Sequence, residues 1–147
     1  MIPKNLTLSQ RAGWARKIRN GNGGDLSEAY LRYYKLKGAQ LRGANLAGAD
    51  LLGVDLSEAH LAGADLTGAD LSMANLTGAD LTGARLTGAN LHRAILRGAK
   101  LDGHELMDVK QFNWASLPER LLPWLTAHPH FSKDLPGLKV TKDRDGF

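Results

Sequence analysis

The sequence contains no cysteine, and aromatic residues make up only 6% of its 147 positions. The absence of cysteine excludes a disulfide framework and a thiolate metal site, and it fits a reducing compartment. With so few aromatics, any core must be assembled from many copies of small apolar residues. No apolar run approaches the roughly 20 residues that span a bilayer, and positions 1–20 lack the apolar stretch of a secretory signal. We therefore expect a cytoplasmic protein that does not bind membranes.

Charge is distributed unevenly along the chain, although the formal net charge is only +4. Positions 1–23 hold five basic residues and no acidic ones, and positions 109–147 hold six basic and four acidic residues. Positions 24–108 hold eight basic and eleven acidic residues. Within them, positions 43–84 contain no lysine or arginine. The acidic residues of this zone, which we name the acidic belt, are Asp50, Asp55, Glu58, Asp65, Asp70 and Asp80.

Leucine recurs at every fifth position from Leu26 to Leu106, seventeen times without interruption. Two positions before each leucine the residue is alanine in thirteen cases, and two positions after it the residue is glycine in eleven. The repeating unit therefore reads Ala-(Asp/Asn)-Leu-(Ser/Thr)-Gly. Such regularity at a fixed period is typical of a repeat protein.

A period of five fits neither a helix nor a long strand. At 100° per residue, a five-residue step would scatter the leucines around a helix, and an odd period sends them to opposite faces of a strand. In a short extended triplet, however, Ala and Leu point to the same side, and the next two residues can turn the chain through a corner. Glycine after Ser or Thr suits a turn position with positive φ. The pattern therefore predicts a chain that winds around its own leucines.

The repeats at positions 24–108 resemble the motif of the pentapeptide-repeat family. The resemblance implies an all-β solenoid at positions 24–110, a right-handed quadrilateral β-helix of about four coils with four pentapeptides in each. Leucines would then stack in internal ladders, with alanine beside them because the interior is narrow. A twenty-residue coil places the acidic belt on all four sides, with only Asp50 and Asp70 stacked on one side.

We expect both ends of the solenoid to differ from its interior, because a solenoid end exposes core and unpaired backbone. Positions 1–23 are predicted to form an N-terminal capping helix, which spans Ser9 to Asn20. Tyr34 and Val54 replace alanine one coil apart, which would widen the first coils to meet that helix.

Positions 111–147 are predicted to form a C-terminal helix and an extended tail. The leucine register fails at Gln111, and Pro118 opens a short apolar segment that Pro123 is expected to distort. The segment either caps the solenoid or joins two subunits into a homodimer. The residues assigned to this role are Leu121, Leu122, Trp124 and Leu125.

The remaining candidate sites have plainer explanations. A basic aromatic cluster has the composition of a surface that stacks nucleic-acid bases, but we favour a first coil that faces a cap and has a solvated rim. Its residues are Tyr30, Arg32, Tyr33, Tyr34, Lys35 and Lys37. His128, His130 and Asp134 have spacings that could hold a metal, yet they lack rigid surroundings. No serine or aspartate is placed to form a triad with a histidine. We therefore predict no catalytic residue, no metal site and no cofactor.

Pentapeptide-repeat proteins include bacterial DNA mimics that bind type II topoisomerases and confer antibiotic resistance. The resemblance thus implies a non-enzymatic homodimer that binds DNA gyrase, with the acidic belt as the partner-binding surface. The alternative is that the belt only stabilises turns, and that the protein is a rigid interaction scaffold, a secreted effector or an adaptor. Neither hypothesis includes a small-molecule substrate, and we do not expect direct binding to nucleic acid.

Overall fold

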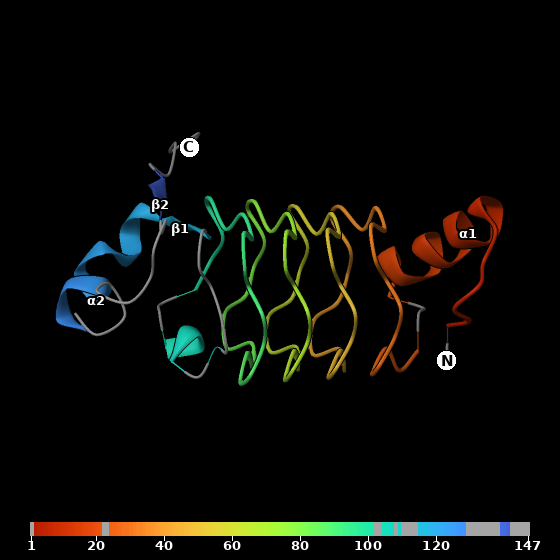
Figure 1. Ribbon diagram of the computed structural model, residues 1–147, viewed down its shortest axis with the longest axis horizontal. Coiled ribbons are helices and arrows are strands. Elements are labelled where there is room, and N and C mark those ends of the chain that lie inside the picture. The colour runs from red at the N-terminus through yellow and green to blue at the C-terminus, as the bar shows by residue number, and fades with distance from the viewer. Residues whose placement is uncertain are drawn as a thin grey trace.

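The computed structural model describes residues 2–21, 24–101, 104–107, 109, 115–128 and 139–141. A stack of coils forms the middle of the molecule, with helix α1 at one end and helix α2 at the other (Figure 1). The elements outside the coils are α1 (Leu8–Arg19), η1 (His104–Leu106), β1 (Ser116–Pro118), η2 (Glu119–Leu121), α2 (Leu122–Ala127) and β2 (Lys139–Thr141).

Each coil consists of twenty residues, as the resemblance implied. Parallel bridges join positions twenty apart, so that one ladder runs through Tyr30, Asp50, Asp70 and Asn90. Each pentapeptide contributes one turn and one bridging residue, and a coil therefore has four turns. The other three ladders are Lys35–Asp55–Asn75–Ile95–Ser116, Gln40–His60–Asp80–Lys100 and Asn45–Asp65–Arg85.

Backbone hydrogen bonds explain why the five-residue unit repeats so strictly. In each interior repeat, the leucine, the residue two after it and the bridging residue donate their N–H groups to neighbouring coils. The alanine N–H closes the turn by donating to the preceding leucine carbonyl. One repeat shows all four: Leu51 N to Asp70 O (2.8 Å), Gly53 N to Ser72 O (2.8 Å), Asp55 N to Tyr34 O (2.9 Å) and Val54 N to Leu51 O (3.0 Å).

Leucine and alanine make up most of the interior. The repeat leucines from Leu46 to Leu81 are inaccessible to solvent, and the alanines two positions before the repeat leucines from Leu51 to Leu81 are at most 1% exposed. Val54 and Tyr34 occupy alanine positions and are buried too, Tyr34 at the end nearest α1. Each leucine buried in this way contributes about 1.5–3 kcal/mol to folding.

The expected positive φ at the turn is also present. Glycines two positions after the leucines have φ between 61° and 69°, the value that a type II turn requires at its third residue.

Helix α1 packs against the first coil through one face. Thr7 and Gln10 form a capping box at its start, which satisfies two backbone donors. Ala15 and Ile18 are buried in the same core as the leucines. The Arg19 carbonyl accepts a hydrogen bond from the backbone of Gln40 (3.0 Å), so the helix end is attached to the coils.

The C-terminal end contains two features that the repeat pattern did not predict. Ser116 pairs with Ile95, and Ala115 and Leu117 are fully buried. The Ala-x-Leu pattern thus resumes after the predicted boundary at 110, shifted by one residue. Strand β2 pairs in parallel with β1 through Val140 opposite Leu117, where only an extended tail had been predicted.

Pro123 lies in the first turn of α2, where a missing N–H is tolerated. It therefore does not distort a helix interior, in contrast to the prediction. Leu121 and Leu125 are buried, whereas Leu122 is 43% exposed. Trp124 is half-buried and stacks on the ring of His128 at 4.7 Å.

Candidate functional site

The five aspartates of the acidic belt lie on the four ladders, at the positions expected from a twenty-residue coil. Asp50 and Asp70 are stacked on neighbouring coils, and Asp55, Asp65 and Asp80 each lie on a ladder of their own. Glu58 lies at a turn, three residues after Asp55. The negative charge therefore surrounds the rod and does not form a single stripe.

The belt aspartates accept a hydrogen bond from the backbone N–H of the residue after each leucine, which forms no backbone–backbone hydrogen bond within the coils. In every repeat with Asp or Asn before the leucine, from Asp25 to Asn90, the side-chain Oδ1 accepts from the N–H two residues later. Ser57 and Ser72 also donate their hydroxyl protons to Asp55 and Asp70, at 2.6 and 2.5 Å. Aspartate thus stabilises the turn through its side chain, and asparagine accepts the same hydrogen bond at Asn45, Asn75 and Asn90.

Cationic side chains neutralise half of the belt. Arg32 pairs with Asp50, Lys37 with Glu58 at 3.1 Å, and Arg85 with Asp65 at 3.5 Å. The cationic side chain of each pair is more than half exposed, and ion pairs open to solvent contribute at most about 1 kcal/mol each. They do, however, remove local negative charge. Within the described residues, neither Asp55 nor Asp70 forms an ion pair.

Asp80 remains ionised well into the acidic range. The hydroxyl and then the backbone N–H of Thr82 donate to its carboxylate at 2.7 and 3.2 Å. These bonds, with weaker attraction from Lys100 and Arg42, hold the pKa of Asp80 below its ordinary value of 3.8. A lowered pKa in the folded state stabilises the fold above the unfolded pKa, and this contribution disappears as pH falls through the folded value.

The basic aromatic cluster is dispersed by folding. Arg32 and Lys37 are used in ion pairs, and Lys4 covers the ring of Tyr30 at 4.2 Å. Tyr34 is buried beneath Arg11, whose guanidinium lies 5.3 Å from the ring centre. A continuous platform for stacking bases is therefore not formed.

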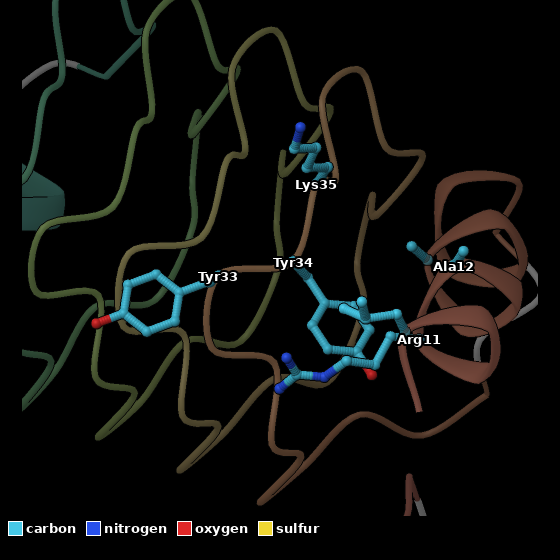
Figure 2. Close-up of a pocket in the computed structure, with 7 residues that line it drawn as sticks. Arg11, Ala12, Tyr33, Tyr34 and Lys35 are labelled. Atoms are coloured by element: carbon cyan, nitrogen blue, oxygen red, sulfur yellow. The ribbon is translucent and has the colours of Figure 1, made fainter. Parts of the chain in front are cut away.

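A groove of about 240 Å³ lies between α1 and the first coil. It is lined by Leu8, Arg11, Ala12, Ala15, Tyr33, Tyr34 and Lys35. Figure 2 shows that the side chain of Tyr34 points toward α1, whereas that of Tyr33 extends away from the helix along the rod. Leu8 is 85% exposed and Tyr33 is 62% exposed.

One edge of the rod carries large side chains where the turns favour glycine. Its members are successive along the stack, because Tyr33 bonds to Leu52, Gly53 to Ser72, and Met73 to His92. Tyr33, Met73 and Arg93 have φ of 58°, 58° and 59°, although the left-handed conformation costs a residue with a side chain about 1–2 kcal/mol. We name this set the Met73 edge: Tyr33, Gly53, Met73 and Arg93.

The Met73 edge was not predicted from the sequence. The sequence did contain a signal for it, because Tyr33, Met73 and Arg93 stand two positions after a repeat leucine, where most repeats have glycine. Only two other described residues with side chains share this conformation, Glu28 and Glu58, and they lie on two other edges. Three of the five therefore recur at multiples of twenty residues, on the same edge of successive coils.

The other predicted sites fall partly outside the described residues. His130 and Asp134 are outside them, and the described part of the chain contains no group of three potential metal ligands. Leu121 and Leu125 pack into the core and Leu122 is exposed, so dimerisation through this segment stays a prediction. Within the described ranges, no helix is long and apolar enough to cross a membrane.

Comparison with known proteins identifies the repeat. The family model for pentapeptide repeats matches residues 25–61, 35–72 and 74–110, with eight copies. Among curated proteins, none matches the chain.

Several solved structures are similar to the chain. A pentapeptide repeat protein (Rfr23) from the cyanobacterium Cyanothece 51142 is 32% identical, with a TM-score of 0.44, over 74% of this chain and 65% of that one. One from the Arabidopsis thaliana thylakoid lumen is 40% identical, with a TM-score of 0.34, over 64% and 61%. This chain thus spans less than two thirds of either. Trypsin-treated QnrB1, a plasmid-mediated fluoroquinolone resistance protein, is 21% identical, with a TM-score of 0.46, over 78% and 64%.

Proposed function

Because this chain belongs to the pentapeptide-repeat family, we propose that it is a non-enzymatic protein that binds another protein through the outer surface of its rod. The observation that carries the proposal is the filled interior. Leucine and alanine side chains, with Val54 and Tyr34, are buried inside the described coils, so the coils offer a partner their outer surface. A rigid surface loses little conformational freedom when it binds a partner.

The unpaired carboxylates are the part of the acidic belt best suited to a partner. Asp55 and Asp70 already direct Oδ1 into their own turns, and in the described structure Oδ2 of each has no hydrogen-bond partner. A cationic side chain of a partner could reach these oxygens without breaking an existing ion pair. At Asp50 and Asp65, by contrast, a partner must compete with Arg32 and Arg85.

We expect Asp55→Asn with Asp70→Asn to reduce the retention of partner proteins from a nuclease-treated bacterial extract on the immobilised chain. The fold should be preserved, because Asn45, Asn75 and Asn90 make the same turn bond in the native sequence. The matched control is Asp50→Asn with Asp65→Asn, which removes the same charge at ion-paired positions and should retain the proteins. If nothing is retained by the unaltered chain above bare beads, protein binding is refuted.

A second candidate is a DNA mimic that binds a type II topoisomerase. The stacking of Asp50 and Asp70 on adjacent coils favours it, since it repeats negative charge along the rod. The ion pairs of Asp50, Glu58 and Asp65 weigh against it. Its test is a gyrase supercoiling assay with and without a quinolone, beside a DNA gel shift. Inhibition or drug protection that is lost in Asp50→Asn, Asp65→Asn, Asp70→Asn would support the mimic, and no effect at micromolar protein would reject it.

A further inference from the structure

The Met73 edge combines backbone strain with exposed apolar side chains, and it lies beside Asp55 and Asp70, the belt aspartates on its two flanking ladders. Met73 is 52% exposed and Tyr33 is 62% exposed. Both hold a left-handed conformation that glycine would adopt at lower cost. Strained residues persist where the rest of the fold imposes them, and they are frequent at binding sites.

The exposed apolar side chains on this edge follow one another along the stack. Tyr33 lies over Gly53, where a Cβ atom would meet the Tyr33 ring at 2.4 Å. Glycine at position 53 therefore allows the ring to extend from the first coil over the second, toward Met73 on the third. Tyr33 also lines the groove beside α1. We call this row of exposed apolar side chains the strip; its members are Leu8 and Tyr33 at the groove and Met73 on the third coil.

The charges beside the strip change from coil to coil. Lys35 follows the Tyr33 turn, Asp50 and Asp55 enclose the Gly53 turn, Asp70 precedes the Met73 turn, and Arg93 is in the fourth turn. The ends are therefore basic and the centre is acidic. Because Arg32 neutralises Asp50, the negative charge left in the centre belongs to Asp55 and Asp70.

We infer that the Met73 edge is a docking surface for a protein segment that presents an apolar side chain beside a central lysine or arginine. The apolar side chain would pack against Met73 and Tyr33, and the cation would bind Oδ2 of Asp55 or Asp70. The inference rests on the proposed function, because it specifies where the partner binds. Phosphate groups of nucleic acid or lipid are disfavoured here, since the centre of the strip is acidic.

The inference predicts which substitution removes binding. Peptides of about a dozen residues, long enough to follow the edge when extended, would be selected from a randomised display library on the intact chain. We expect enriched peptides with an apolar residue beside Lys or Arg. Met73→Gly should weaken their binding at least about tenfold, as the loss of a central apolar contact does. Asp55→Asn with Asp70→Asn should weaken it too.

Glu58→Gly is the matched control, because Glu58 has the same φ of 58° at the equivalent turn position of another edge. Both glycine variants relieve the same strain, so neither should lower the melting temperature, and only Met73→Gly should lose the peptides. Enriched peptides that bind Met73→Gly as tightly as the intact chain would overturn the inference and leave protein binding at another face possible. The absence of enriched peptides, or a dimer of this chain that Met73→Gly dissociates, would overturn it as well.

The failure of the inference can be distinguished from the failure of the proposed function. In the first case, proteins of the extract are still retained by both the intact chain and Met73→Gly. In the second case, the intact chain retains none.

Discussion

Leu66→Ala is expected to reduce the free energy of unfolding by about 2–5 kcal/mol, the range for buried leucines whose surroundings relax only partly. Leu66 is inaccessible to solvent in the middle of the stack, and leucine ladders on both sides hold the coil in place. Collapse around the cavity is limited further because every interior repeat is bonded to the coils before and after it. Chemical denaturation monitored by circular dichroism would measure the loss.

Leu52→Ala is the control for this prediction, because Leu52 is a leucine outside the interior ladder and is only half-buried at a turn. The same substitution should cost less than about 1 kcal/mol there. Equal losses at the two positions would contradict the interpretation that stability comes from the interior leucines.

Ile18→Asp is expected to lower stability by several kcal/mol and to detach α1 from the first coil. Ile18 is fully buried and joins the core of the coils, and a carboxylate there would be separated from water without a cation. End units that cover a repeat stack protect the first coils, so the coils near Tyr34 should also lose protection. Hydrogen exchange resolved along the chain would detect both effects.

Ala12→Asp adds the same charge to an exposed position of α1. It should cost only the difference in helix propensity, about 0.7 kcal/mol or less. If Ile18→Asp leaves hydrogen exchange in the first coils unchanged, α1 does not cap the stack.

The five-residue period was sufficient to predict that the chain winds around its own leucines, because the period follows the backbone hydrogen bonds. The four pentapeptides in each coil came from the resemblance to the family. Leucine fills the interior, alanine leaves room beside it, and glycine adopts the positive φ of the turn. The family match to residues 25–110 carries with it the right-handed β-helix. The ends were predicted less well. The stacking of Ala115 and Leu117 required a one-residue shift that periodicity alone does not reveal, and the pairing of β2 with β1 joins segments without a shared pattern.

The candidate site was predicted only in part. The sequence located the acidic belt and offered the alternative that its aspartates stabilise the turns. Nine hydrogen bonds from turn N–H groups to Asp or Asn side chains agree with that alternative. It did not reveal which carboxylates are neutralised, because the partners Arg32 and Arg85 lie on neighbouring coils, roughly twenty residues away in sequence. The Met73 edge was missed for a related reason. Tyr33, Met73 and Arg93 are exceptions to the repeat, and their alignment becomes visible only when the chain is wound into coils.

Site-specific photo-cross-linking in bacterial cells tests the central claim, that this chain binds a protein through its outer surface. A photoreactive residue would replace Met73, Glu58 or Glu28 in turn, three positions with the same left-handed conformation on three different edges. We predict a cross-linked protein at position 73, with little or none at positions 58 and 28. The absence of a cross-linked protein at all three positions would contradict the claim.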